Sequence, residues 1–98
     1  MAVTSGLLVV LEAKEGQGAE LAAFLEAGRD IAAAEQGTVT WYAFKLADTT
    51  FGVFDTFDSE DARQAHLDGE IPKALAQVGP DLLAKDPDIR RVDLVAVK

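Results

Sequence analysis

The stretch TVTWYAFKLADTTFGVFDTFDSEDARQAHLDGEIPKAL, residues 38–75, decides the fold of this chain. Its first half holds two runs rich in β-branched and aromatic residues, 38–46 and 50–57, and only residues 47–49 separate them. Such runs favour strands, and so short a connection joins antiparallel neighbours. The acidic, cap-forming residues 58–61 (DSED) then favour a helix start. The stretch therefore predicts a β-hairpin followed by a helix.

Upstream of the hairpin, the chain predicts one strand and one helix. Residues 6–13 (GLLVVLEA) are aliphatic and β-branched, as in a strand. From residue 19, apolar residues recur at three- and four-residue steps between charged ones, which predicts an amphipathic helix of about four turns. We expect this helix to stop near Glu35, with Gly37 in the left-handed conformation that ends helices at no steric cost.

Downstream of the hairpin, the chain predicts an interrupted helix and a last strand. Gly69 and Pro72 are expected to interrupt the helix, and a further helical segment to run up to the Gly-Pro pair at residues 79–80. One more turn is expected at residues 82–83. Residues 89–97 (IRRVDLVAV) alternate in polarity, which predicts the final strand.

The predicted order of elements is strand, helix, strand, strand, helix, strand, which is the ferredoxin-like βαββαβ pattern of α+β proteins. Short connections and right-handed crossovers then give a four-stranded antiparallel sheet with the helices on one face. The sequence shows no internal repeat and no linker, so residues 1–98 are expected to form a single domain.

The composition of the 98 residues argues against several classes of function. A formal net charge of −8 disfavours binding to nucleic acid or to anionic membranes. With no cysteine and one histidine, the chain offers neither a disulfide framework nor a cysteine or multi-histidine metal site. The longest apolar run, residues 7–11, is too short for a membrane span and lacks the basic flank of a signal peptide. We therefore expect a cytoplasmic protein without metal.

Both faces of the predicted hairpin are apolar. One set of alternate residues contains Val39, Trp41, Ala43, Phe51, Val53 and Phe57, and the other contains Tyr42, Phe44, Leu46 and Phe54. An antiparallel sheet covered by helices on one side would carry polar residues on the other, so something must cover the second face. The simplest cover is a second copy of the chain, and we expect a homodimer. The alternative is a monomer whose strand ends and loops hide the second face.

His66 is the first candidate for chemistry. It follows Ala62 and Ala65 on the inner face of its helix, so the ring should point toward the sheet among small side chains. Histidine is the side chain whose ordinary pKa suits proton transfer near neutral pH. The alternative is a core histidine whose ring nitrogens are satisfied by the backbone.

Asp55 is the second candidate, because it lies mid-strand among phenylalanines, where an unpartnered carboxylate is costly. Three cations could pair with it: Arg63 on the following helix, or Arg90 or Arg91 on the last strand, of the same chain or of a partner chain. Such a pair could serve only to fix the hairpin or the dimer, or Asp55 could orient His66 or a substrate hydroxyl. Glu12, closer to a loop, is expected to be solvated.

The hairpin carries six of the seven aromatic residues of the chain, namely Trp41, Tyr42, Phe44, Phe51, Phe54 and Phe57, and the seventh is Phe24. Concentrated aromatics beside small residues suit a flat apolar ligand. The alternative is that they are the core of a small domain.

On these residues the chain resembles the antibiotic biosynthesis monooxygenase family of small dimeric α+β barrel proteins. The likeness rests on the Gly-Thr strand with aromatics, the strand end Phe54-Asp55-Thr56-Phe57, the acidic helix cap, and the helix up to His66. The resemblance implies a barrel-like dimer and places the helix histidine of the family at His66 and its acidic strand residue at Asp55. Members include cofactor-independent oxygenases of polycyclic phenols and quinols, haem-degrading enzymes and isomerases of small signalling sugars.

The chain also departs from that family. It has no asparagine, whereas the haem-degrading members and the best-known polyketide oxygenases are similar in using one near the pocket. They also carry a tryptophan at or near the third strand, and here the single tryptophan, Trp41, is on the second. Haem degradation is therefore not expected.

These observations and the resemblance together lead us to expect a monooxygenase without metal, flavin or other cofactor, acting on a small phenol, hydroquinone or polyketide-like aromatic. His66 would be the base, with Asp55 beside it, and Tyr42 or Trp41 would donate to the oxyanion. Phe24, Phe44 and Phe54 would bind the ring and exclude water. The alternatives are an isomerase of a small carbonyl compound and a non-catalytic binding or stress-response dimer.

Overall fold

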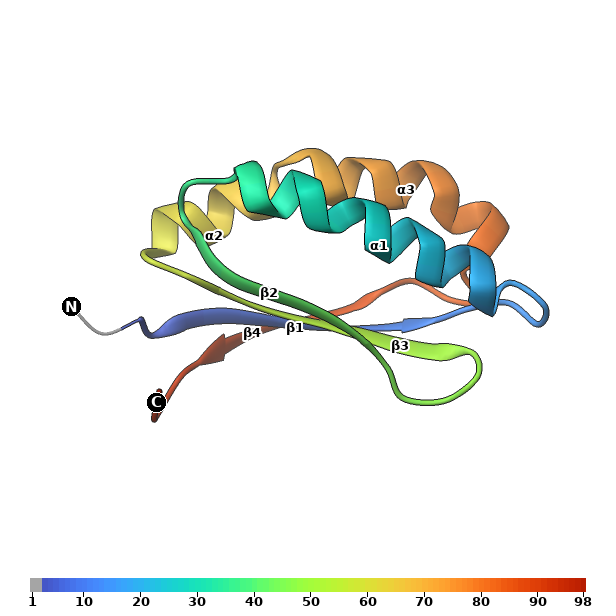
Figure 1. Ribbon diagram of the computed structural model, residues 1–98, viewed down its shortest axis with the longest axis horizontal. Coiled ribbons are helices and arrows are strands. Elements are labelled where there is room, and N and C mark those ends of the chain that lie inside the picture. The colour runs from blue at the N-terminus through green and yellow to red at the C-terminus, as the bar shows by residue number, and fades with distance from the viewer. Residues whose placement is uncertain (1–2) are drawn as a thin grey trace.

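The four strands pair antiparallel in the order β2-β3-β1-β4, which is the ferredoxin-like arrangement. A computed structural model describes residues 3–98 (Figure 1). The elements are β1 (Ser5–Glu12), α1 (Gly18–Ala34), β2 (Thr38–Lys45), β3 (Thr50–Phe57), α2 (Glu60–Leu67), α3 (Glu70–Leu82) and β4 (Asp88–Asp93). The first four agree with the sequence-based ranges to within one residue at each end. The predicted fold is confirmed.

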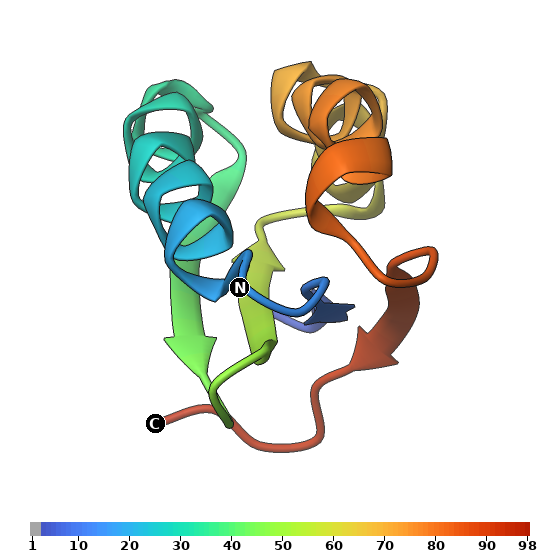
Figure 2. The same ribbon diagram turned by 90° about the vertical axis from the view of Figure 1, so that its right-hand side faces the viewer.

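All three helices cover the same face of the sheet (Figure 1). Viewed end-on in Figure 2, α1 lies over the β2 side and α3 over the β4 side. The core between the layers comes from alternate strand residues and the inner helix faces, and its most buried apolar members are Leu7, Leu11, Leu21, Leu25, Phe51, Val53 and Phe57. Alternation along β1 and β3 therefore directs one row of side chains toward the helices.

The opposite face of the sheet carries no helix in the part of the chain that the structure describes (Figure 1). Its apolar side chains are Leu8, Val10, Tyr42, Phe44, Phe54 and Val92, all of them half-buried or exposed. We call these six residues the open face. The expectation that both sides of the sheet are apolar is confirmed.

Gly37 differs from the sequence prediction. Within residues 3–98 only Gly16 has a positive φ, so Gly37 is not a left-handed helix end. Glycine is needed there for a different reason, because a Cβ at residue 37 would lie 2.4 Å from the Cβ of Ala62 in α2. The missing side chain allows α2 to approach the connection between α1 and β2.

Three further details of the sequence prediction are corrected. The helix α3 does not end before Gly79 but continues through Pro80 to Leu82. The last strand ends at Asp93 rather than at residue 97. A register shift between Thr38 and Thr40 puts Val39 in a bulge, where it is about half exposed rather than part of the core.

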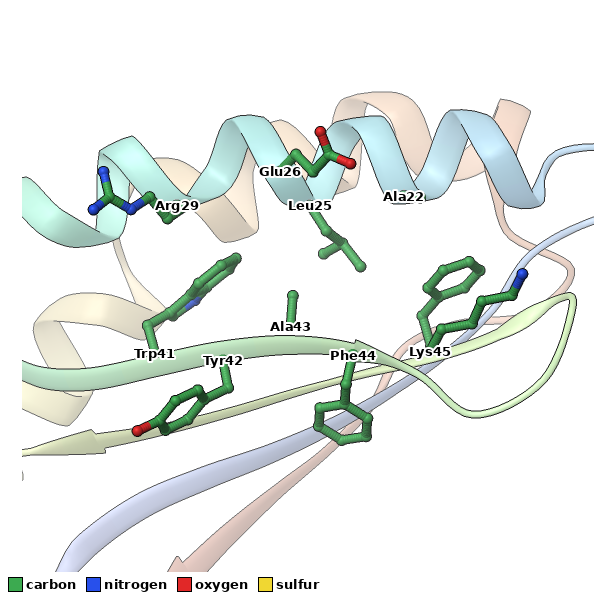
Figure 3. Close-up of a pocket in the computed structure, with 10 residues that line it drawn as sticks. Ala22, Leu25, Glu26, Arg29, Trp41, Tyr42, Ala43, Phe44 and Lys45 are labelled. Carbon is green, nitrogen blue, oxygen red and sulfur yellow. The ribbon is translucent and has the colours of Figure 1, made fainter.

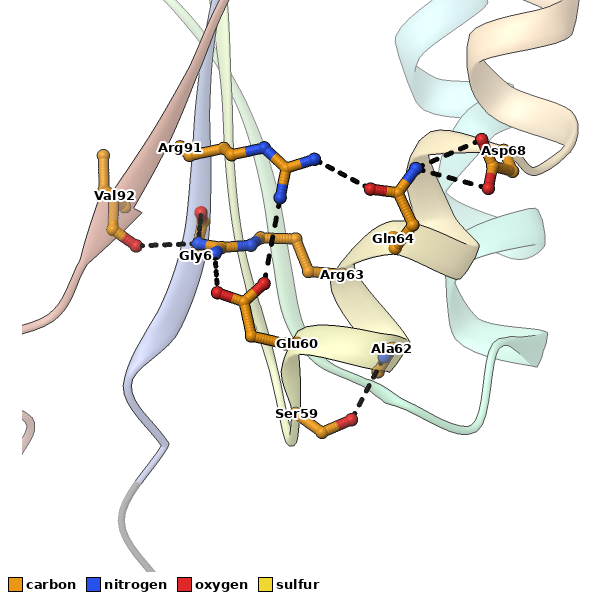
Figure 4. Close-up of polar contacts among 9 residues, drawn as sticks. All are labelled: Gly6, Ser59, Glu60, Ala62, Arg63, Gln64, Asp68, Arg91 and Val92. Carbon is orange, nitrogen blue, oxygen red and sulfur yellow. Dashed lines mark hydrogen bonds and ion pairs between the residues drawn. The ribbon is translucent and has the colours of Figure 1, made fainter.

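Arg63 anchors α2 on the sheet (Figure 4). Its guanidinium is buried and donates from Nη1 to the backbone carbonyls of Gly6 in β1 and Val92 in β4, each at 3.2 Å. Its Nη2 pairs with Glu60, one turn earlier on the same helix. These contacts fix the position and rotation of the helix that carries His66.

An added methyl group is expected to have opposite effects on stability at two glycines of the fold. Gly37→Ala should destabilise the fold by about 1 to 3 kcal/mol, because the contact with Ala62 cannot be relieved without moving α2. In α1, a Cβ at residue 28 would meet nothing nearer than 3.5 Å, an ordinary contact with the Trp41 ring, so Gly28→Ala should stabilise by about 0.5 to 1 kcal/mol. Urea denaturation of both variants measures these changes. A stabilised Gly37→Ala protein would contradict the close approach of α2.

Candidate active site

The imidazole of His66 lies between two carboxylates. It occupies the inner face of α2, one turn beyond Arg63, and is only 7% exposed. Its Nδ1 is 2.7 Å from Oε1 of Glu35, and its Nε2 is 3.1 Å from Oδ2 of Asp55. The ring of Phe57 packs beside it, with the two centroids 5.2 Å apart. The sequence-based expectation that the ring points toward the sheet agrees with this geometry.

Asp55 takes His66 as its charged partner. The carboxylate is in the middle of β3, between Leu7 of β1 and Trp41 of β2, and is 1% exposed. Within residues 3–98 neither carboxylate oxygen has a hydrogen bond of standard geometry. The contact of Oδ2 with Nε2 of His66 is within ion-pair distance, but the oxygen does not lie along the direction of an N–H bond at Nε2. A buried carboxylate needs such a partner, and it retains capacity to accept hydrogen bonds.

The three arginines expected as partners for Asp55 all pair elsewhere within the chain, which corrects that expectation for pairing inside one molecule. Arg63 binds the carbonyls described above, and Arg90 pairs with Asp88 at 2.9 Å. Arg91 donates to Gln64 at 2.8 Å and lies 3.8 Å from Glu60 (Figure 4). Arg90 and Arg91 have exposed side chains that reach water rather than the centre of the sheet.

Opposing effects set the pKa of His66. Burial of the ring lowers the pKa, since burial disfavours the charged form, while the contacts with Asp55 and Glu35 raise it. The carboxylates prevail, and the pKa of His66 is raised above its ordinary 6.5. The ring therefore holds a proton more strongly than a solvent-exposed histidine.

The same side chains border a small, partly enclosed cavity of about 50 Å³ between the helices and the sheet. Its walls are mostly aliphatic, and they include Phe24 from α1. The polar groups in its lining are Asp55, His66 and the indole of Trp41, whose buried Nε1 has no hydrogen-bond acceptor within residues 3–98. Four of the residues expected at the site, His66, Asp55, Trp41 and Phe24, are thus brought together.

Three other residues expected at the site lie away from the His66 cavity, namely Tyr42, Phe44 and Phe54. Strand alternation puts these three side chains on the open face, and Figure 3 shows Tyr42 and Phe44 directed away from α1. Tyr42 is 60% exposed. The hairpin aromatics are therefore two groups on opposite faces rather than one cluster, and the expected roles of these three residues do not fit the His66 cavity of their own chain.

Sequence reasoning missed Glu35, which it treated only as the end of a helix. Glu35 is the C-cap of α1, and its Oε1 also accepts a hydrogen bond from the hydroxyl of Thr38 at 2.7 Å. An acidic side chain is unfavourable at a helix C-terminus, where the dipole is negative. That mismatch was the available signal that Glu35 has a partner elsewhere.

Glu12 is not simply solvated, as the sequence suggested. Its carboxylate accepts hydrogen bonds from the hydroxyls of Thr49 and Thr50, the latter at 2.6 Å. These two hydrogen bonds lower the pKa of Glu12. The residue ties the hairpin loop to β1 and takes no part in the site.

A larger groove of about 470 Å³ runs between α1 and the edge strand β2 (Figure 3). Glu26, Arg29 and Lys45 border it, and each of these charged side chains is exposed. It is open to solvent and lacks a buried titratable group among its lining residues. We therefore place the chemistry at the smaller cavity, where the buried charges are.

None of the helices in residues 3–98 is long and apolar enough to cross a membrane. Over the same residues, no three His, Asp or Glu side chains gather in a way that could hold a metal ion. Glu35 and Asp55 lie on opposite sides of the imidazole instead of converging on one point.

No protein-family model matches this chain, and no curated protein matches it. Among solved structures, a protein of unknown function from Nitrosomonas europaea is 48% identical, with a TM-score of 0.96 over 98% of this chain and 93% of that one. This chain belongs to the family of that protein.

Other similar structures share the fold at much lower identity. One from Nitrosomonas europaea, named "Putative antibiotic biosynthesis monooxygenase", is 12% identical with a TM-score of 0.84, over 97% of this chain and 93% of that one. A structure of the same name from Chloroflexus aurantiacus is 20% identical with a TM-score of 0.74, over 97% and 96%. These likenesses confirm the ferredoxin-like fold.

The raised pKa of His66 predicts a pH-dependent contribution to stability. The folded pKa lies above the unfolded value of 6.5, so the stabilisation is complete below about pH 6.5 and is lost as the pH rises through the folded pKa. His66→Gln should therefore melt at a lower temperature than the unmodified protein. The difference between the two melting temperatures should be larger at about pH 6 than at about pH 9. Equal differences at both pH values would show that the carboxylates do not hold the imidazolium.

Proposed function

We propose that this protein is a cofactor-independent monooxygenase of the antibiotic biosynthesis monooxygenase type, acting on a small phenol, hydroquinone or polyketide-like aromatic. The observation that carries the proposal is the buried pair of Asp55 and His66 at the wall of an apolar cavity. The two low-identity structures that bear the monooxygenase name support it through the shared fold.

The proposed chemistry begins with a proton transfer. A substrate hydroxyl donates to the Asp55 carboxylate, which has unfilled acceptor capacity, and the proton passes to the Asp55–His66 pair. The Nε1–H of Trp41 is free to donate to the oxyanion that forms. The aliphatic walls exclude water, which strengthens both interactions.

The substrate anion then supplies the electrons. A phenol with a free ring position can react with one dioxygen to give a quinone and one water. One oxygen atom becomes the new ring carbonyl, the other leaves as water, and all four electrons come from the ring. The reaction needs no metal or flavin, so the protein contributes a base, a donor and a dry site.

An aromatic ring needs more room than the cavity of about 50 Å³ provides, since a cavity of about 150 Å³ holds benzene. Pro72, Leu75 and Ile89 separate the cavity from a larger hollow of about 590 Å³ between α3 and β4, because they line both spaces. We infer that the substrate enters on this side, with Leu75 and Ile89 turning outward.

The small volume of the cavity favours a second candidate, an isomerase of a small carbonyl compound. Here the Asp55–His66 pair would move a proton at the carbon next to a carbonyl, and the Trp41 indole would donate to the enolate oxygen. A non-catalytic binding dimer is the third reading. Oxygen consumption distinguishes the monooxygenase from the isomerase and from the binding dimer, because only the monooxygenase uses dioxygen.

We also propose that two copies of the chain associate through the open face. Six apolar side chains of the open face lie uncovered by any helix in residues 3–98. Pairing two such faces would bury apolar surface on both sheets, which favours a symmetric dimer.

Oxygen uptake with a panel of phenols and hydroquinones tests the catalytic proposal. His66→Gln and Asp55→Asn should each reduce the rate by about a hundredfold or more, as expected when a general acid–base group is lost. Asp61→Asn is the matched control, because Asp61 is an exposed carboxylate on the same helix as His66. Substrate turnover without oxygen uptake would favour the isomerase, and full activity of both site variants would remove the proposed base.

Sedimentation equilibrium tests the dimer. The unmodified protein should have twice the mass of one chain, and Phe54→Lys should shift it toward single chains by placing a charge in the middle of the open face. Ala23→Lys, on the exposed side of α1, should leave the mass unchanged. A stable single chain for the unmodified protein would exclude the dimer.

A further inference from the structure

Three titratable side chains form a line from the interior of the protein to its surface. Asp55 is 1% exposed, His66 is 7% exposed, and the side chain of Glu35 is 23% exposed. The two carboxylates contact opposite nitrogens of the same ring, Nε2 on the inner side and Nδ1 on the outer side. An imidazole in this position can receive a proton at one nitrogen and release one at the other.

His66 also borders two separate spaces. On its inner side it lines the inner cavity, the space of about 50 Å³ shared with Asp55 and Trp41. On its outer side it lines a hollow of about 240 Å³, together with Glu35, Gly37, Thr38 and neighbouring residues at the end of α1 and on α2. Glu35 and His66 therefore line the same hollow, which is open to solvent.

Local contacts hold Glu35 in this position. Oε1 accepts from Thr38 Oγ1 and from the imidazole, both at 2.7 Å. The close approach of α2 at Gly37 brings the histidine within reach of the end of α1. Glu35 is thus fixed by residues from α1, β2 and α2, although it does not line the inner cavity.

We propose that Glu35 is the outer member of a proton relay, Asp55–His66–Glu35, which exchanges protons between the inner cavity and solvent. Glu35 is a positioning and proton-exchange residue rather than a catalytic one, since it contacts His66 and not the space where a substrate would bind.

The relay moves one proton outward and one inward per turnover. With His66 neutral and protonated at Nδ1, a proton from the cavity binds Nε2 and the Nδ1 proton leaves through Glu35 to water. The ring is then neutral and protonated at Nε2. In the return step, Glu35 delivers a proton to Nδ1, and the Nε2 proton passes back to the cavity, where it protonates the product. No group changes oxidation state.

Within residues 3–98, the carboxylates of Asp55 and Glu35 are the only charged groups within ion-pair distance of the His66 ring. Asp55 faces it from β3 and Glu35 from the end of α1. Arg63 on its own helix is directed to carbonyls of β1 and β4. The charged residues of α3 nearest in sequence, Glu70 and Lys73, are exposed. On the outer side of the ring, Glu35 is therefore the titratable group that contacts Nδ1.

The single histidine makes the relay measurable without substrate. In ¹⁵N-labelled protein, all imidazole signals belong to His66, and the exchange of its N–H protons with water can be followed by NMR. Glu35→Gln preserves size and a hydrogen-bond acceptor but cannot carry a proton, so exchange should slow by about tenfold or more. Glu20→Gln, in the first turn of the same helix, should leave exchange unchanged.

A purely structural Glu35 would give a different result. If Glu35 only positions the ring, Glu35→Gln should keep the N–H exchange rate of the unmodified protein. Persistence of the contact between His66 and Phe57 would show that the ring has stayed in place. An unchanged exchange rate with this contact intact would overturn the relay. If Glu35→Gln does not fold, Glu35→Asp replaces it, because the shorter side chain withdraws the carboxylate from Nδ1. Slower exchange in Glu35→Asp would support the relay, and unchanged exchange would overturn it.

The catalytic use of the relay rests on the proposed function, and the two can fail separately. If oxygen uptake is found, Glu35→Gln should lower kcat with little change in KM, and formate in the buffer should restore part of the rate. If no phenol consumes oxygen while exchange still depends on Glu35, the relay stands and the monooxygenase proposal falls.

Discussion

The burial of the Asp55 carboxylate in the middle of the sheet is the constraint on which the rest of the structure depends. A charge at this depth is tolerated only with a partner, and the side chain that reaches it is His66 on α2. The placement of α2 therefore has to be accurate. Arg63 anchors the helix on β1 and β4, and the absence of a side chain at Gly37 lets the helix come close enough.

Much of the fold could be predicted from the sequence, because its signals are local. Strand periodicity, the acidic cap before α2 and the break at Gly69 each act within a few residues. The inward direction of His66 followed from the helical period. The boundaries that were wrong, at Pro80 and at the end of β4, depend on tertiary packing instead of local preference.

The site was less predictable, since its contacts join residues far apart in the chain. Glu35 and His66 are 31 positions apart, and nothing in either segment identifies the other. For Asp55 the sequence left a pair with one of three arginines and a contact with His66 both open, and the carboxylate lies 3.1 Å from Nε2 of His66. The hairpin aromatics were grouped by sequence proximity, whereas strand alternation places Tyr42 and Phe44 on the far side of the sheet.

Arg63 gives the edge of the sheet a mechanical connection to the imidazole. It joins an edge strand, β4, to a helix of only two turns, and His66 lies one turn further along that helix. Moving β4 away from β1 would break one of the two hydrogen bonds of Arg63 Nη1, because this nitrogen binds Gly6 of β1 and Val92 of β4 together. The guanidinium therefore links two strands to α2 without contacting either carboxylate beside His66.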